Sequence, residues 1–344
     1  MPTTTPSNQQ LDRDTPDTLR LSVAEATALG SRALHSLGFP DDDVQIIVDQ
    51  LIDNALCGYP FASLPRILAI AQDARTRWPR QPVRVVHDTP VSALLDGGNN
   101  VGYVAVYRAA QIAIDKAQVR QFAVVGVYNS YYSGRNAYYM EMIARAGLVG
   151  IHLASAQPHV VPPGGTRPAL GTNPLCIGFP SAHGPVIVDM GTAAFQWGEV
   201  LLHAHLGLPL PEGVGLDRDG RPTRDARETV LGGVLPFGGH KGYGLSFAIQ
   251  AMGLLAGAAL ARGQVQDYGF LFIAFDPGLL IPAEQFTQQV SDLIARLKAI
   301  PRQPGVEEIR IPSERAFRER ERRRVEGIVL ERKVVEALNA LIAS

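Results

Sequence analysis

The chain has 344 residues, of which 46% are apolar and 19% charged, a composition typical of a globular protein that needs no metal or disulfide to fold. Its 32 basic and 33 acidic residues provide no excess charge for nucleic acid or an anionic membrane, so we expect neither as a partner. No apolar run reaches the roughly 18 residues that a membrane span requires. Cys57 and Cys176 lie far apart and outside metal-ligand spacing, which predicts reduced thiols in a cytoplasmic protein.

The first 80 residues divide into a polar start and a helical unit. Residues 1–19 lack the apolar core of a signal peptide, which predicts a flexible tail. Residues 20–80 carry helix signals, beginning with the capping-box pattern of Ser22 and Glu25. We expect this unit to pack with helices in residues 312–344.

Residues 81–235 change to a strand-like character and predict a sheet domain. Loops rich in Gly, Pro, Ser and Asn separate the apolar runs, and residues 97–100 (Gly-Gly-Asn-Asn) are a turn signal. A helix is expected over residues 103–117. The predicted strands are 122–127, 149–154, 175–179 and 186–190.

Residues 236–311 form a third predicted unit, with helices and a strand that complete the site. An apolar helix follows Gly238 and extends to about residue 261, before a strand at 270–275. Later helices are expected over 283–297, 313–324 and 331–342. The charged run 318–324 predicts a solvated helix face.

Several familiar signatures are absent from the sequence. It has no G-x-G-x-x-G after a strand, no Walker A, and no G-x-S-x-G, H-E-x-x-H or C-x-x-C motif. The eight histidines show no ligand spacing, so we expect no metal site.

Four loops remain as candidate sites because they combine glycines, hydroxyls or a charge. Asp189 ends an apolar strand, a position typical of ligand sites in open sheets and equally of helix caps. Lys241 lies among glycines and suits a cofactor phosphate, although a solvated loop has the same composition. The four loops are 129–134, 171–174, 188–194 and 235–245.

Taken together and in this order, these segments resemble the type-2 malate/L-lactate dehydrogenase family, which includes sulfolactate and ureidoglycolate dehydrogenases and Δ1-piperideine-2-carboxylate/Δ1-pyrroline-2-carboxylate reductases. The resemblance covers the chain from about Leu21 to its end. The sharpest matches are Leu170-Gly-Thr-Asn-Pro174, Asp189-Met190 with Thr192, and Gly238-Gly-His-Lys-Gly-Tyr-Gly-Leu245, with Pro312-Ser-Glu314 as a late element.

The resemblance implies an α/β, sulfolactate dehydrogenase-like fold with a large, mostly antiparallel sheet and flanking helices, not a classical Rossmann fold. It also implies a homodimer, a small-molecule substrate, and NADPH or NADH as cofactor. Arg66 matches the residue that holds the substrate carboxylate. The cofactor contacts would come from Ser130, Thr172, Asn173, Met190, Gly191, Thr192, His240, Lys241, Ser313 and Glu314.

The chain departs from the family where protons are handled. Ala62 occupies the place of the expected proton-donating histidine, Tyr132 replaces a second histidine, and Glu199 replaces a usual lysine. A ketone needs a proton donor during hydride addition, whereas a protonated imine already carries its proton. We therefore expect a reductase of a cyclic 2-imino acid, in which Asp189 stabilises the iminium.

Two alternatives stay open at this point. The chain is also consistent with a 2-oxo acid/2-hydroxy acid dehydrogenase in which Tyr132 is the acid, or with a cofactor-binding homologue that has lost turnover. Tyr59 and Phe61 are candidate lining residues of the substrate pocket. Candidate partners for the 2′-phosphate of NADPH include Arg120, Arg135 and Arg167.

Overall fold

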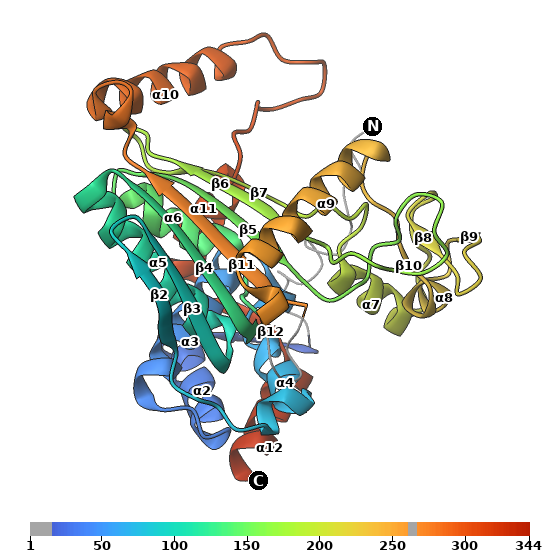
Figure 1. The fold of residues 1–344 in the computed structure, drawn as a ribbon. Helices are drawn as coiled ribbons and strands as arrows, with labels where there is room; N and C mark the ends of the chain where they lie inside the picture. The colour runs from blue at the N-terminus through green and yellow to red at the C-terminus, as the bar shows by residue number, and fades with distance from the viewer. Residues whose placement is uncertain (1–15, 261–266) are drawn as a thin grey trace.

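The computed structural model describes residues 16–260 and 267–344 and is built around a seven-stranded sheet (Figure 1). Neighbouring strands are antiparallel except for one parallel pair, β3 with β4. This confirms the predicted large, mostly antiparallel sheet. In spatial order the strands are β2 (Arg84–Thr89), β3 (Ser92–Val101), β4 (Phe122–Tyr131), β11 (Gly269–Phe275), β5 (Val149–Ser155), β6 (Leu175–Phe179) and β7 (Val186–Met190).

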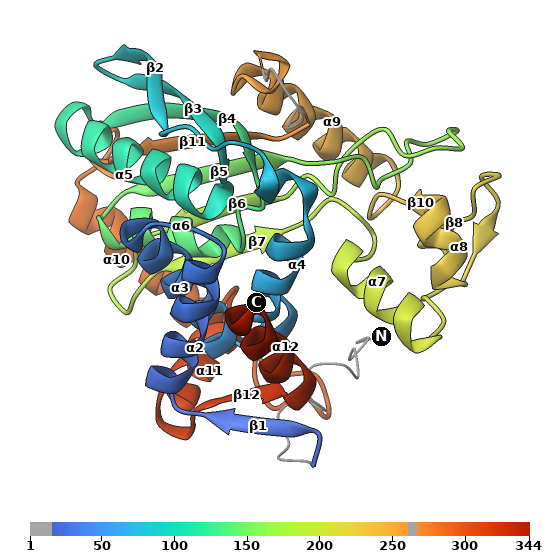
Figure 2. The same cartoon turned by 90° about the horizontal axis from the view of Figure 1, so that it is seen from below.

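Helices cover both faces of this sheet (Figures 1 and 2). Helices α5 (Gly102–Arg120) and α6 (Asn136–Arg145) lie on one face, where α5 approaches closely because its sheet-facing residues are alanines. Helix α9 (His240–Leu255) crosses the other face over β5 and β11. A Cβ atom on Gly126 of β4 would lie 3.0 Å from Ala256, directly after α9, so glycine permits this close approach.

The two ends of the described chain pack together beneath the sheet (Figure 2). Helix α12 (Arg332–Ala343) packs on α2 (Val23–Ser36), and α11 (Glu314–Glu326) packs on α3 (Asp41–Leu56). The capping box of Ser22 and Glu25 is present at the start of α2. Strand β1 (Thr18–Leu21) pairs with β12 (Ile328–Glu331). The predicted tail 1–19 is therefore wrong at its last two residues, and residues 1–15 lie outside the described part.

A smaller lobe extends from the far end of the sheet (Figure 1). It has a separate apolar core that includes Val160, Val200 and Val234. Its elements are α7 (Trp197–Leu206), β8 (Gly215–Leu216), β9 (Pro222–Thr223), α8 (Ala226–Leu231) and β10 (Gly233–Val234). The remaining elements are α4 (Pro65–Gln72), α10 (Ala283–Lys298) and the short turns η1 (Pro60–Ala62), η2 (Ala74–Arg77), η3 (Ala258–Leu260) and η4 (Pro277–Leu279).

Among the helices that the structure describes, none has the length and apolar character needed to span a bilayer.

Strand β11, from the stretch 236–311, lies between β4 and β5, so this stretch contributes a central strand to the sheet.

Residues 97–100 were expected to form a turn, and this prediction is wrong because β3 continues through them. Gly98 and Asn99 both have positive φ, 61° and 60°, and the register with β4 shifts between Asp96 and Asn100. The glycine and asparagine signal therefore marks an irregularity inside a strand, which such residues permit at low steric cost.

The charged run 318–324 is not wholly a solvated face, because Arg320 of α11 is only 5% exposed. Its guanidinium binds Glu141 of α6 through both Nη atoms, at 2.7 and 2.5 Å. It also forms an ion pair with Asp53 of α3, with Nε 2.9 Å from Oδ1. Asp53 in turn binds Arg135, immediately before α6. One buried charge network thus joins three helices.

We predict that Arg320→Ala lowers the free energy of unfolding by about 3–5 kcal/mol, because it leaves Glu141 buried without its main partner. The matched control is Arg324→Ala on the same helix, where the arginine is exposed and pairs with Glu321. That change should cost about 0–1 kcal/mol. Urea unfolding of both variants measures the difference, and equal losses would contradict a structural role for the network.

Candidate active site

Three of the loops singled out in the sequence lie side by side. The carbonyl of Thr172 accepts hydrogen bonds from both the backbone N–H and the hydroxyl of Thr192, at 2.8 and 3.0 Å. The carbonyl of Thr192 accepts from the N–H of Phe237 at 2.9 Å. The loops 171–174, 188–194 and 235–245 therefore form one connected wall.

Two predicted cofactor residues have side chains that the fold already uses. The amide nitrogen of Asn173 donates to Ser246 and Gln250 of α9, and its oxygen accepts from the N–H of Ala156. The hydroxyl of Ser130 donates to the carbonyl of Asn100 at 2.6 Å, and the residue is fully buried. If these residues contact a cofactor, their backbone groups are the ones that remain for it.

The glycine-rich start of α9 leaves room for a ligand to approach its backbone. A Cβ atom on Gly239 or Gly244 would meet no atom within 4 Å. Positive φ explains glycine at position 239, but Gly244 lies within a regular helix, where glycine costs about 1 kcal/mol relative to alanine. His240 and Lys241 are exposed at this helix start. The segment therefore fits a bound phosphate-bearing cofactor.

Asp189 lies at the end of β7, as predicted, and its carboxylate oxygen Oδ2 accepts from the N–H of Ala137 at 2.9 Å. It therefore caps α6 rather than the helix that follows it in sequence. Part of the residue is exposed to solvent. The protein atoms around the carboxyl nevertheless desolvate it, and this raises its pKa.

Arg135 is the cation beside this carboxylate, although it is firmly bound elsewhere. Its Nε donates to Asn54 at 2.9 Å and its Nη2 binds Asp53. This excludes the role of 2′-phosphate ligand that the sequence left open for Arg135. The same Asn54 donates to the carbonyl of Ala62 at 2.9 Å, which holds the backbone of the residue at the position where the sequence comparison led us to expect a histidine.

Arg66 and Tyr132 are brought together from distant parts of the chain. The guanidinium carbon of Arg66 lies 5.6 Å from the centre of the Tyr132 ring, at the end of β4. Tyr132 adopts a positive φ of 57°, which is uncommon for a bulky residue and indicates a constrained position. In the described part of the chain, the guanidinium of Arg66 has no hydrogen-bond or ion-pair partner, so it is available to an anionic ligand.

Asp73 and Arg75 are site residues that the sequence reasoning missed. The guanidinium of Arg75 lies 5.1 Å from the centre of the Tyr132 ring and is bound to Asp73 through two nitrogens, with Nε 2.8 Å from Oδ1. Burial and then the nearby Asp73 raise the pKa of Tyr132 to about 12. Nothing in a lone Asp-x-Arg pattern distinguishes this pair from a surface ion pair.

The two predicted lining residues, Tyr59 and Phe61, lie on the loop between α3 and α4. Tyr59 stacks near Arg135 and Arg315, with guanidinium carbons 5.5 and 5.3 Å from the ring centre. Phe61 is 43% exposed and reaches α7, where a Cβ atom on Gly198 would lie 3.3 Å from its ring. The loop therefore bridges the main body and the smaller lobe.

Two further predicted residues, Ser313 and Glu314, lie at the start of α11, and Ser313 contacts the strand that carries Asp189. The hydroxyl of Ser313 donates to the carbonyl of Ile187 at 2.8 Å. Burial would raise the pKa of Glu314, but hydrogen bonds from Ile311, Lys298 and Arg318 outweigh it and lower the pKa to about 2. Met190 and Gly191 follow Asp189 directly, and Met190 is exposed.

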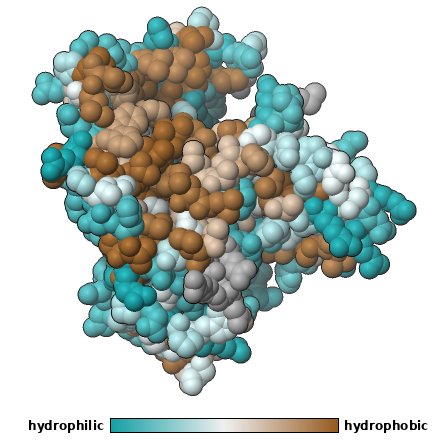
Figure 3. Space-filling model, viewed as in Figure 1, coloured by the Kyte–Doolittle hydropathy of each residue, from teal (hydrophilic) through white to brown (hydrophobic). Residues whose placement is uncertain are grey.

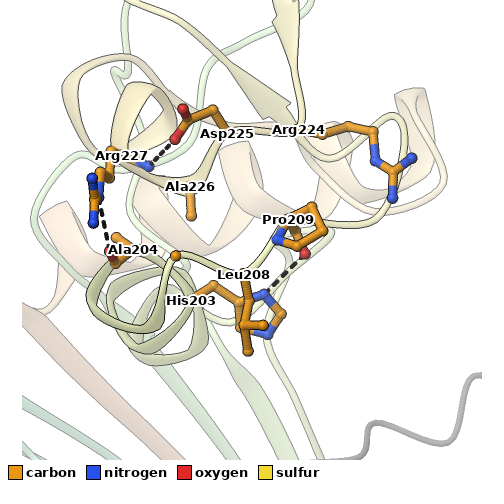
Figure 4. Close-up of a pocket in the computed structure, with 9 residues that line it drawn as sticks. His203, Ala204, Leu208, Pro209, Arg224, Asp225, Ala226 and Arg227 are labelled. Atoms are coloured by element: carbon orange, nitrogen blue, oxygen red, sulfur yellow. Dashed lines mark hydrogen bonds between the residues drawn. The ribbon is translucent and has the colours of Figure 1, made fainter.

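A separate open hollow of about 390 Å³ lies between α7 and α8 (Figure 4). Arg224 and Arg227 lie at its edge, and His203 contributes to its lining. It contains none of the predicted site residues. Within residues 16–260 and 267–344, no group of three His, Cys, Asp or Glu side chains is arranged to hold a metal ion.

The order of these loops along the chain matches a known family model, described as malate/L-lactate dehydrogenase, over residues 21–339. The chain belongs to this family. It is similar to L-sulfolactate dehydrogenase of Methanothermobacter thermautotrophicus, with 33% identity over 331 residues that cover 93% of this chain and 95% of that protein. The chain is thus an oxidoreductase.

Two further comparisons support this assignment. The Delta(1)-pyrroline-2-carboxylate/Delta(1)-piperideine-2-carboxylate reductase of Pseudomonas putida is 33% identical over 264 residues, 72% of this chain and 74% of that protein. The solved structure of sulfolactate dehydrogenase from Methanocaldococcus jannaschii matches with a TM-score of 0.85 and 28% identity, covering 94% and 97% of the two chains. The predicted sulfolactate dehydrogenase-like fold is confirmed.

We predict that Gly244→Ala weakens binding of reduced nicotinamide cofactor while leaving the protein as stable as before or slightly more so. The added methyl enters open space at the helix start and favours the helix by up to about 1 kcal/mol. Titration of cofactor fluorescence measures the affinity and thermal unfolding measures stability. Gln289→Ala, which also introduces alanine at an exposed helical position but on α10, is the control and should leave the affinity unchanged. Unchanged affinity in Gly244→Ala would contradict a cofactor role for this surface.

Proposed function

We propose that the chain reduces a small cyclic 2-imino carboxylic acid, of the Δ1-pyrroline-2-carboxylate or Δ1-piperideine-2-carboxylate type, with NADPH or NADH as the donor. The open backbone at Gly239 and Gly244, with Lys241 beside it, supports a nicotinamide cofactor in the predicted place. A reduced nicotinamide, when bound, supplies the hydride. Side chains of this chain bind the substrate carboxylate and stabilise the charge on its nitrogen.

The observation that carries the proposal is the set of charges among the candidate residues, namely a guanidinium without an ion-pair partner, a carboxylate, and an alanine at the position of the expected imidazole. In the described residues the guanidinium of Arg66 contacts the Tyr132 ring but has no carboxylate partner, so it suits the substrate carboxylate. Asp189 is exposed and accepts one hydrogen bond, from the N–H of Ala137, so its carboxylate suits a cation. Ala62, held by Asn54, offers no proton.

These residues match the charges of a protonated imine. The substrate's carboxylate lies against Arg66, and its iminium nitrogen lies near Asp189, which favours the protonated form that accepts hydride. Hydride adds to the carbon of the C=N bond and the electron pair moves to nitrogen, which yields a cyclic secondary amine. No proton has to be donated in this step, so Ala62 is sufficient where the family has histidine.

Reduction of a 2-oxo acid is the second candidate, because the similar protein from Methanothermobacter thermautotrophicus is named a sulfolactate dehydrogenase. That reaction needs an acid, and Tyr132 is the candidate. Its pKa of about 12 makes it a weak donor near neutral pH, since an efficient general acid titrates near the working pH. The imine reaction is therefore favoured.

The proposal is tested by following reduced-nicotinamide absorbance with two substrate sets, cyclic 2-imino acids and 2-oxo acids, and with each cofactor. We expect turnover of the imines, and expect Tyr132→Phe to retain most of it because Tyr132 donates no proton. Turnover confined to 2-oxo acids, with a loss on the order of 10²-fold or more in Tyr132→Phe, would establish the second candidate instead. Cofactor binding without any turnover would indicate a retired enzyme.

The pH dependence provides a separate prediction for Asp189. Because its pKa is raised, its charge is lost at a higher pH than for an ordinary aspartate, so kcat/KM for the imine should fall as pH decreases through that raised pKa. Asp189→Asn should reduce turnover on the order of 10²-fold and remove this acid limb. Asp88→Asn, an exposed carboxylate on β2, is the control. An unaltered acid limb in Asp189→Asn would assign the limb to another group.

We further propose that the protein is a cytoplasmic homodimer. Helix α9 presents a band of large apolar side chains to solvent, among them Phe247, Leu254 and Leu255. Figure 3 shows apolar surface extending across this side of the molecule around α9. A contiguous apolar face of this kind on a globular protein is typical of a subunit interface.

A further inference from the structure

Two guanidinium groups lie against the same ring in the site. The guanidinium carbons of Arg66 and Arg75 lie 5.6 and 5.1 Å from the centre of the Tyr132 ring. If both charges were free, the pocket would suit a substrate with two anionic groups, because each guanidinium matches one carboxylate or sulfonate. Their surroundings, however, are not alike.

Arg75 has a carboxylate partner within the chain. It is 7% exposed, and it binds Asp73 through two nitrogens in the forked geometry that arginine and carboxylate prefer. The backbone N–H of Arg75 also donates to Asp73 at 2.9 Å. Burial opposes ionisation of Asp73, but these bonds from Arg75 outweigh it and lower the pKa of the carboxyl. The pair is therefore charged and internally neutral.

The other cations near the pocket do not replace Arg75. Arg135 is bound to Asp53, and Arg315 lies over Tyr59 from an exposed position on α11. Phe61 contacts α7 at Gly198. The next residue of α7, Glu199, is acidic and therefore adds no positive charge. Of the two guanidiniums beside Tyr132, only Arg66 is uncompensated within the described residues.

We infer that the substrate carries a single anionic group, and that Asp73 sets this limit by neutralising the second guanidinium beside Tyr132. The inference rests on the proposed function for the identity of the pocket. It goes beyond that function because related proteins differ in this respect: sulfolactate carries a carboxylate and a sulfonate, whereas the pyrroline and piperideine carboxylates carry one carboxylate.

The physical reason is the cost of removing a second anion from water. A carboxylate or sulfonate placed beside the Asp73–Arg75 pair meets no net positive charge and loses its hydration without compensation. Discrimination that depends on an unpaired buried charge is strong, on the order of 10²-fold or more in kcat/KM.

The experiment compares substrates in matched pairs with the full-length wild-type protein and its cofactor. The imine pair is Δ1-piperideine-2-carboxylate against Δ1-piperideine-2,6-dicarboxylate, and the keto pair is pyruvate against oxaloacetate. We expect the single-anion member to be favoured by about 10²-fold or more in whichever pair is reduced. Equal or better use of the dianionic member would overturn the inference.

The two pairs keep this inference separate from the proposed function. Reduction of pyruvate but not of the imines would contradict the proposed function, while the pyruvate-to-oxaloacetate ratio would still test the charge limit. If neither pair is reduced, the protection against thermal unfolding by pyrrole-2-carboxylate and by pyrrole-2,5-dicarboxylate, with cofactor present, gives the same ratio. Failure of both to bind would overturn the inference as well.

Asp73→Asn tests the residue assigned to the limit, because it keeps the shape of the side chain and removes its charge. We expect the ratio of kcat/KM for the single-anion substrate to kcat/KM for the dianion to fall by about tenfold or more. The reason is that the guanidinium of Arg75, no longer neutralised by residue 73, can then pair with the second anionic group of the substrate. Asp43→Asn, which breaks an Asp–Arg pair with Arg108 on α5 at 3.2 Å, is the matched control and should leave the ratio unchanged. A purely structural role for Asp73 would lower both rates and leave their ratio unaltered, which would overturn its assignment.

Discussion

The buried ion pairs around Arg320 hold together parts of the chain that are far apart in sequence. Arg320 comes from α11, Asp53 from α3, and Glu141 from α6, the helix that begins beside the candidate active site. Asp53 also forms an ion pair with Arg135. Two residues after Arg135, the N–H of Ala137 donates a hydrogen bond to the carboxylate of Asp189. The position of Asp189 therefore depends on charges buried at the start and in the middle of α6. A buried polar network whose members are paired makes the parts of the chain that it joins more rigid.

Much of the main sheet was accessible from the sequence. Strands β5, β6 and β7 are short apolar runs bounded by Gly and Pro, and their predicted ranges agree with the structure within a residue or two. The pairing of β1 with β12 was not accessible, because four-residue strands at opposite ends of a chain give no local signal of each other. The irregularity in β3 was mistaken for a turn because both use glycine and asparagine at positive φ.

In the candidate site, too, some features could be predicted from the sequence and others could not. The loops with Thr172, Thr192 and Lys241 were identified by composition and resemblance, and backbone hydrogen bonds connect the first two with the segment that precedes Lys241. The pairing of Asp73 with Arg75 was missed because its importance comes only from the Tyr132 ring, more than fifty positions later in the chain. Likewise, the burial of Arg320 is invisible in a run of seven charged residues, since burial is decided by what packs against the helix.

The place of β11 in the sheet has a consequence for synthesis. Strands β4 and β5 are complete by residue 155, yet the strand that joins them begins at Gly269. While the chain is being translated, both strands therefore expose unpaired N–H and C=O groups along one edge for more than a hundred residues of elongation. Such edges are templates for pairing with other chains. The nascent protein consequently passes through a long interval in which these two edges are open to pairing with other chains, whereas in the finished sheet β11 occupies both.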